Sequence, residues 1–251
     1  MKNNWPHLSR APIQEALIDV RVRFSQRMAL ETLAKFADQV RDAYPTSGTR
    51  ETWQGGFHLR VGERPMVAEP EGGPDGYIST SADQRQVVQA RVDGFTFSRL
   101  REYQDWDQLR KEAKRLWDVY RQITSPDSVT RVAVRYINQI KLPAPVQSLG
   151  EWLRTGPDVS PLLPRELAGF YMRLEIPFPQ ANARAILTQA LLTKEIAPQE
   201  RIPILLDIDV FRTGEFAPES ESIWDALEDL RAIKNEVFFG SITKRTQELL
   251  Q

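Results

Sequence analysis

The chain has no cysteine and only two histidines, His7 and His58. The missing cysteines exclude disulfides, thiol nucleophiles, iron–sulfur clusters and cysteine-ligated zinc within the chain. Two histidines are too few for a three-histidine zinc site. We therefore expect neither a cofactor nor a metal bound by these residue types.

Long hydrophobic runs and an excess of charge of one sign are also missing. The apolar segments are short and interrupted by charge, as in residues 202–211, so none is long enough to span a bilayer. No continuous apolar stretch lies between Lys2 and Arg10, so we expect no secretory signal and a cytoplasmic location. The 33 basic and 34 acidic side chains give a net charge of −1, which disfavours a non-specific nucleic-acid binder.

Common catalytic motifs are absent as well. The sequence contains no Gly-x-Ser-x-Gly elbow for a serine nucleophile and neither type of glycine-rich phosphate loop. The Glu-x-Glu-x-Lys run of tunnel-type triphosphate hydrolases does not occur. His58 lies among glycines on an expected strand, where a lone histidine is more typical of a packed or exposed side chain than of a general base.

What the sequence does contain is segments with one apolar and one charged face. Its 251 residues, 41% hydrophobic and 27% charged, are ordinary for a soluble globular protein with a sizeable core. Polar side chains alternate with apolar ones at Asp19, Arg21 and Arg23, then at Arg131, Arg135, Gln139 and Lys141, and again at Asp207 and Asp209. A period of two with one apolar face predicts a sheet with one side buried and the other side available.

The order of the expected elements predicts an α+β fold, with mostly antiparallel sheet backed by three long helices. We expect strands at residues 11–24, 49–61, 76–100, 129–142, 170–178, 184–193 and 202–213. We expect one helix at residues 25–44 with Ser25 as N-cap, and a second that begins at the capping box of Asp105 and Gln108 and ends before Pro126. Two more are expected at 222–238 and 241–250, separated at Gly240. A short echo between residues 94–98 and 237–241 leaves two related halves open.

The proline content divides the chain. We expect an N-terminal α+β half at residues 1–142 and a C-terminal β-rich half at 165–251, packed as one unit. Residues 143–164 form the expected linker, with one short helix capped by Ser148 and Glu151 and packed by Trp152 and Leu153. The Pro/Gly-rich residues 62–76 are the best candidate for a mobile loop.

Four segments give the chain a resemblance to a sporadically distributed, conserved hypothetical bacterial family of this length. They are Ala11-Pro12-Ile13-Gln14-Glu15-Ala16-Leu17-Ile18-Asp19-Val20-Arg21; Phe95-Thr96-Phe97-Ser98-Arg99-Leu100 with Tyr103 and Trp106; Arg135-Tyr136-Ile137-Asn138-Gln139-Ile140; and Leu230-Arg231 with Lys234-Asn235-Glu236-Val237-Phe238-Phe239. Since these segments run through nearly the whole chain, the resemblance implies a shared architecture. The family brings no established activity, and its patchy occurrence suits a mobile or defence-related gene.

Charged residues of the expected polar sheet face form the candidate binding surface: Glu15, Asp19, Arg21, Arg135, Arg173, Asp207 and Asp209. Asp207 and Asp209 would lie about 6.5–7 Å apart, which suits either a hard cation or arginines on neighbouring strands. Cross-strand Asp–Arg pairs are common on sheet faces, so we favour a ladder of ion pairs over a metal site. Asn138 should lie on the opposite, apolar face and bond to loop backbone, and Trp106 and Trp117 fit the core.

Aromatic and basic side chains also alternate in two segments, and such interleaving can stack on and neutralise single-stranded nucleic acid. They are Arg50, Trp53, Phe57 and Arg60, and then Arg99, Arg101 and Tyr103. Aromatics on strands are mostly packing residues, and with the net charge near zero we do not favour nucleic acid as the partner.

These patterns favour a cytoplasmic bacterial protein that binds or regulates a partner protein, or a second copy of itself, through the charged sheet face. They point to no catalytic residue, no cofactor and no membrane. The alternative is a metal-dependent phosphohydrolase that acts on a nucleotide or a polyphosphate at the same face.

Overall fold

The computed structural model of the chain describes residues 5–54, 57–58, 66–67, 71–160, 162–163, 167–191 and 201–251. Its main feature is a nine-stranded antiparallel sheet, which confirms the predicted α+β class. The strands lie in the spatial order β2 (Thr46–Gln54), β5 (Glu71–Thr80), β6 (Gln86–Arg91), β7 (Gly94–Leu100), β1 (Ile13–Arg23), β8 (Ser128–Pro143), β11 (Arg201–Phe216), β10 (Ala183–Leu191) and β9 (Tyr171–Phe178). A separate two-stranded ribbon is formed by β3 (Phe57–His58) and β4 (Met66–Val67).

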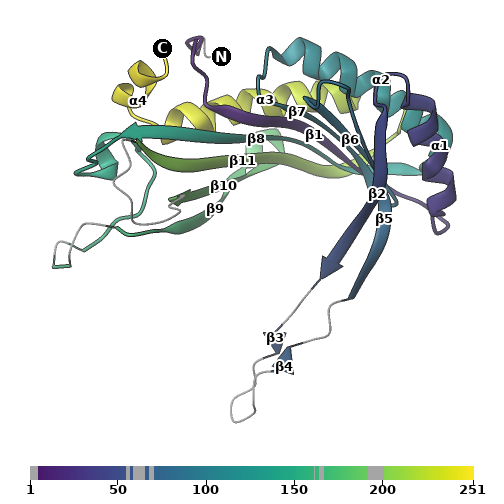
Figure 1. Cartoon of the computed structure of the whole chain (residues 1–251), viewed down its shortest axis with the longest axis horizontal. Helices are drawn as coiled ribbons and strands as arrows, with labels where there is room; N and C mark the ends of the chain where they lie inside the picture. Colours follow the sequence, from purple (N-terminus) through teal and green to yellow (C-terminus); the bar gives the residue numbers. More distant parts are fainter. Residues whose placement is uncertain are drawn as a thin grey trace.

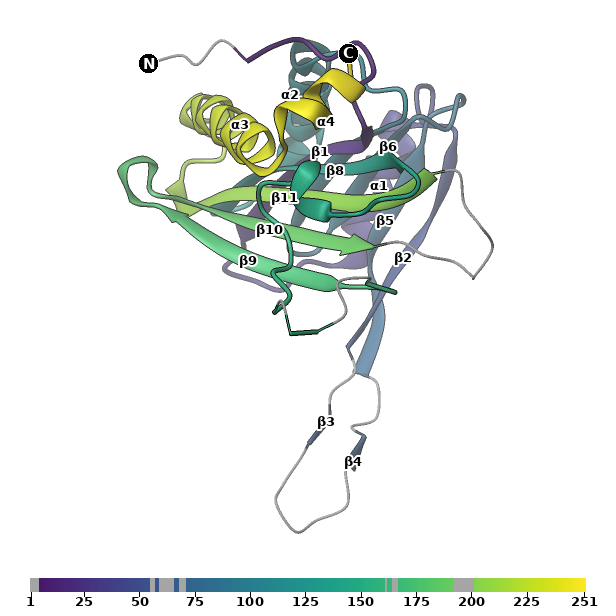
Figure 2. The ribbon, with the colours of Figure 1, turned by 90° about the vertical axis from the view of Figure 1, so that its left-hand side faces the viewer.

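The sheet curves into an arch, and its helices lie on the outer, convex side (Figure 1). They are α1 (Leu30–Val40), α2 (Trp106–Thr124), α3 (Ser222–Ser241) and the short C-terminal α4 (Lys244–Leu249). Figure 2 shows the same arrangement from the side, with α2 and α3 above β1, β8 and β11. In the described part of the chain, no helix lies on the concave side of the central strands.

The core lies between the sheet and these helices. Strand β1 presents Ile18 and Val20, both fully buried, to the helix side, as its alternating pattern predicts. Phe95 of β7 packs edge-on against Phe36 of α1 and Trp117 of α2, with ring centroids 6.5 and 6.0 Å apart. The apolar face of the sheet is therefore closed off, and the charged face points the other way.

Strand β8 lies next to β1, the middle strand of the sheet. It pairs with β1 on one side and with β11 on the other, so the sheet continues from the expected N-terminal half into the C-terminal half. The expected linker holds one 3-10 turn, Leu149–Glu151, beside the buried Trp152 and Leu153. Ser148 does not cap that turn, and Glu151 pairs instead with Arg245 of α4.

The first helix is shorter than predicted. Ser25 does not cap it, because its hydroxyl donates to Asp127 (2.7 Å), and α1 begins at Leu30 after an uncapped Ala29. Tyr44 lies beyond the end of the helix, where its buried hydroxyl is within hydrogen-bond distance of the side-chain oxygens of Gln86 (2.8 Å) and Glu112 (2.7 Å). In α2 the prediction is confirmed: Asp105 accepts the Gln108 backbone N–H at 2.8 Å.

Two turn predictions were wrong in part. Residues 71–76 of the expected mobile loop belong to β5, where Pro74 lies opposite Glu51 of β2; residues 62–65 and 68–70 lie outside the described residues. Helix α3 continues through Gly240, and the break comes at Ile242 and Thr243, whose side chain caps α4. The echo between residues 94–98 and 237–241 matches a strand with a helix, so it marks no structural repeat.

Candidate functional site: the charged face of the sheet

The concave side of the central strands carries a continuous set of charged side chains, which we call the charged face. From β1, β8 and β11 it receives Glu15, Asp19, Arg21, Arg131, Arg135, Asp207 and Asp209. Their positions follow from the alternation that buries the intervening residues against the helices. The structure thus brings six of the seven predicted site residues onto neighbouring strands of one face; the seventh, Arg173, is on the edge strand β9.

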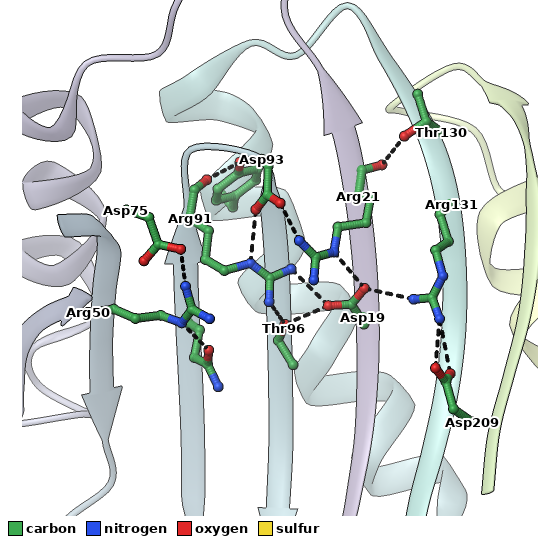
Figure 3. A network of polar contacts seen from close by, with 12 residues as sticks. Asp19, Arg21, Arg50, Asp75, Arg91, Asp93, Thr96, Thr130, Arg131 and Asp209 are labelled. Carbon is green, nitrogen blue, oxygen red and sulfur yellow. Dashed lines mark hydrogen bonds and ion pairs between the residues drawn. The ribbon is translucent and has the colours of Figure 1, made fainter. Parts of the chain in front are cut away.

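Asp19 is the centre of this network (Figure 3). Its carboxylate, only 6% exposed, accepts hydrogen bonds from Arg91 (2.8 Å), the Thr96 hydroxyl (2.8 Å), Arg131 (3.0 Å) and Arg21 (3.1 Å). Four donors, one each from β1, β6, β7 and β8, therefore converge on a single buried carboxylate.

Arg131 links Asp19 to a second carboxylate. Its guanidinium donates to both carboxylate oxygens of Asp209, at 2.8 and 3.1 Å, and lies over the ring of Phe211. The same guanidinium donates to Asp19 through its other terminal nitrogen. Arg131 thus joins β1 to β11 across β8.

The two carboxylates bound by Arg131 differ in acidity. Burial alone would raise the pKa of Asp19, but the charges of Arg91, Arg21 and Arg131 outweigh burial and hold that pKa below its usual value. For Asp209, burial prevails over the charges of Arg131 and Arg135, and the nearby Asp19 adds repulsion, so its pKa is raised. Of the two, Asp209 is the carboxylate that takes up a proton first.

Arg135 and Asp207 form a separate ion pair farther along β8 and β11. Two parallel hydrogen bonds, of 2.8 and 2.5 Å, join the guanidinium to the carboxylate in the fork geometry that arginine favours. The Arg135 side chain is 43% exposed, whereas that of Asp207 is 12% exposed. The carboxylate therefore holds the guanidinium in place while much of the cation faces outward.

Glu15 and Arg173 lie outside the ladder of ion pairs. The charge of Glu15 reaches Arg135 without a hydrogen bond. Arg173 stands on the exposed side of β9 and forms no ion pair with the part of the chain that the structure describes. Glu175, two residues farther along β9, pairs with Arg184 of β10.

Sequence reasoning missed the most buried cation of the charged face. Arg91 has a side chain only 5% exposed, and it donates to Asp19, Thr96 and Asp93. Arg50 extends the network to β2 through Asp75 and Gln89. The signal was present, because Gln89 and Arg91 alternate with the buried Val88 and Ala90 on β6.

Half-buried apolar side chains lie between the charges of the charged face. They are Leu17 of β1, Ile137 of β8, Leu205 and Phe211 of β11, and Ile186 of β10. In register, Ile137 stands between Glu15 and Asp207, and Ile186 stands beside Asp209. The face therefore combines fixed guanidinium groups with accessible aliphatic surface.

The predicted acidic pair does not form a cation site in this arrangement. Asp207 and Asp209 are each bonded to an arginine, and a cation would have to displace Arg135 or Arg131 to bind them. In the described ranges no group of three acidic or histidine side chains is placed to hold a metal ion. The predicted ladder of ion pairs is confirmed on β1, β8 and β11.

The structure shows where some of the other residues singled out in the sequence lie. Asn138 is on the opposite, apolar face, where its side-chain amide donates to the strand carbonyls of Leu206 and Tyr136 instead of loop backbone. The side chains of Trp53, Phe57, His58 and Arg60 lie outside the described residues. Trp106 and Trp117 are buried, as predicted.

Among the described residues, no helix is long and apolar enough to cross a membrane. A comparison of the sequence with protein-family models found no match, and a comparison with curated proteins found none either.

Proposed function

We propose that this chain is a binding protein that recognises a partner protein through the charged face. The observation that supports this most directly is the fixed guanidinium of Arg135, which Asp207 holds in a two-point hydrogen bond while 43% of the arginine side chain stays exposed. Arginine held in this way is preorganised, so little side-chain entropy is lost when a partner binds it.

The neighbours of Arg135 fit the same role. Half-buried Leu17 and Ile137 flank it on β1 and β8, and Arg131 and Asp209 continue the alternation of charge. Protein interfaces combine apolar patches with arginine, whereas nucleic-acid sites require a clear excess of positive charge. In the ion pairs of the charged face, five arginines (Arg21, Arg50, Arg91, Arg131 and Arg135) are matched by five aspartates (Asp19, Asp75, Asp93, Asp207 and Asp209), and Glu15 adds one further acidic side chain.

The strand order supports two related halves as part of this proposal. The two central strands, β1 and β8, each have as their outer neighbour the strand that directly precedes a long helix. That neighbour is β7 before α2 in the first half and β11 before α3 in the second. The charged face is built at the junction of the two halves.

The experiment is site-specific photo-crosslinking in the native host. A benzophenone amino acid replaces Ile137 on the charged face, and in a control it replaces Lys111, which is exposed on α2. We expect one discrete crosslinked protein from position 137 and none of that protein from position 111. The purified partner should then bind the intact chain directly.

A charge-swapped variant completes the experiment. Arg135→Asp combined with Asp207→Arg keeps an ion pair between β8 and β11 but reverses its direction, so we expect an unchanged unfolding midpoint and loss of the crosslink. An equal crosslink from both positions, or a crosslink that persists in the folded swap variant, would contradict the proposal.

A metal-dependent phosphohydrolase at the same face is the second candidate. It would need Asp207 and Asp209 to exchange their arginines for a cation when substrate binds. The effect of metal ions on the unfolding of the whole molecule distinguishes this candidate from the first.

A further inference from the structure

A cleft of about 920 Å³ opens on the side of the sheet away from the charged face. Residues 5–13, residues 101–106 and one side of α3 form its walls, and Tyr136 and Asn138 of β8 form part of its floor. All four segments that give the chain its family resemblance contribute residues to it. The volume is in the range of sites that bind small molecules.

The walls of the cleft are rich in aromatic side chains. Trp5 stacks on Phe239 with centroids 4.8 Å apart, and Phe238 meets Phe239 edge-on. Trp106, at the start of α2, also lines the cleft and lies against the guanidinium of Arg231. These rings offer an apolar surface to the body of a ligand.

Lys234 is the one cation of this α3 wall that has no acidic partner in the described part of the chain. Arg231 pairs with Glu228, which also accepts the indole N–H of Trp106. The Lys234 ammonium instead lies 3.8 Å from the centre of the Tyr136 ring and donates to the Asn235 side-chain oxygen (2.6 Å). Burial, with the charge of Arg231 added, lowers the pKa of Lys234 to about 7.

A hydrogen-bond donor lies close to this lysine. The hydroxyls of Tyr103 and Tyr136 are 3.0 Å apart, and only one of their two hydrogens is used in the bond between them. The other hydrogen can be donated to an acceptor in the cleft. An ammonium without a carboxylate beside a free hydroxyl hydrogen is complementary to an anion with two acceptor oxygens.

We propose that the cleft binds a small organic acid, whose carboxylate pairs with Lys234 and whose apolar body lies against Trp5, Trp106 and Phe238. A buried charge costs free energy unless it is paired, so the carboxylate supplies the partner that the chain itself does not provide. The site is independent of the charged face, because Tyr136 and Asn138 face the helix side of the sheet.

Calorimetric titration and thermal unfolding with a matched pair of probes test the proposal. 3-Phenylpropionate carries the carboxylate and an aromatic body, and 3-phenylpropionamide has the same shape without the charge. We expect the acid to bind and to raise the unfolding midpoint, and the amide to bind at least tenfold more weakly. Lys234→Met should fold, since it removes a desolvated charge, and should weaken binding of the acid at least tenfold.

Lys111→Met, at an exposed position of α2, is the control and should bind the acid like the unmodified chain. Equal binding of acid and amide, or unchanged binding to folded Lys234→Met, would overturn the proposal. So would the absence of binding by a series of aromatic and aliphatic acids, or a preference for inorganic phosphate over all of them.

Discussion

At the scale of single residues, Asp19 shows how a buried charge is kept in the sheet. Burial alone would raise its pKa, but the charges of three guanidiniums, those of Arg91, Arg21 and Arg131, outweigh burial and lower it. A buried ion pair adds little net stability over an apolar substitute, but removing one partner leaves an uncompensated charge. The value of Asp19 to the fold is therefore that it neutralises Arg91, whose side chain is 5% exposed.

Replacing Asp19 by Asn should lower the free energy of unfolding by about 3 kcal/mol at neutral pH. The matched variant Asp209→Asn should lose less than about 1 kcal/mol, because Arg131 keeps Asp19 as a partner and the fold already disfavours the Asp209 charge. Urea unfolding of the two variants measures the difference. Equal losses would show that the two carboxylates are equivalent and refute the central role of Asp19.

The same pair of variants has a defined pH dependence. The folded pKa of Asp19 is below its unfolded value, so its contribution is complete above the unfolded pKa of 3.8 and is lost as the pH falls through the folded value. The gap between the unmodified chain and Asp19→Asn should close in strongly acidic solution. The folded pKa of Asp209 is raised, so ionisation of this carboxylate lowers the stability of the folded protein, and that loss disappears as the pH falls below its unfolded pKa.

At the scale of elements, strand β5 shows two glycines with different roles. A Cβ at Gly76 would lie 2.2 Å from the carbonyl oxygen of Ala90 and 2.9 Å from the Cα of Arg91, both on the neighbouring strand β6. A Cβ at Gly73 would meet no atom within 4 Å. Close approach of β5 to β6 beside Arg91 thus depends on the absence of a side chain at position 76.

Gly76→Ala should destabilise the protein by about 2 kcal/mol or more, because backbone atoms of β6 must shift. Gly73→Ala on the same strand should change stability by no more than about 1 kcal/mol, in either direction. Denaturant unfolding of both variants checks this. If Gly76→Ala were as stable as Gly73→Ala, the packing of β5 against β6 would not be as close as described.

Elements were predictable where a local signal had no competitor. The alternation in β1 and β8 and the capping box of α2 gave nearly correct boundaries. The predicted start of α1 was wrong because the Ser25 hydroxyl donates to Asp127, which is about a hundred residues away in the sequence. The first part of β5 was not predicted, because its glycines and Pro74 are typical of a turn, and only the pairing with β2 makes this segment a strand.

At the scale of the whole molecule, the sequence could assign residues to a face but not to a neighbour. Periodicity placed Asp207 and Arg135 on polar faces, yet their pairing requires β8 to lie beside β11, which no local pattern encodes. For the same reason the cleft could not be foreseen, since Tyr103, Tyr136 and Lys234 meet there only after the segment between β7 and α2 is assembled with β8 and α3. The contacts that could not be predicted are those between residues far apart in the sequence.

The unfolding midpoint of the whole molecule should be unchanged by Mg²⁺ or Mn²⁺, with or without nucleoside triphosphates, because arginines already neutralise the carboxylates of the charged face. A ligand that binds only the native state must raise the midpoint, so thermal unfolding is a direct test. A metal-dependent rise that Asp207→Asn abolishes would favour the phosphohydrolase over the binding protein.

The one-to-one matching of arginine and aspartate on the charged face also has a kinetic consequence. Opposite charges a few ångströms apart cancel at a distance, so the arch projects little long-range field toward an approaching molecule. Without electrostatic steering, encounters proceed at the unassisted rate, about 10⁵–10⁶ M⁻¹s⁻¹, and depend little on salt. Discrimination among partners would then reside in the lifetime of the complex, which ends when Arg135 and its neighbours release their contacts.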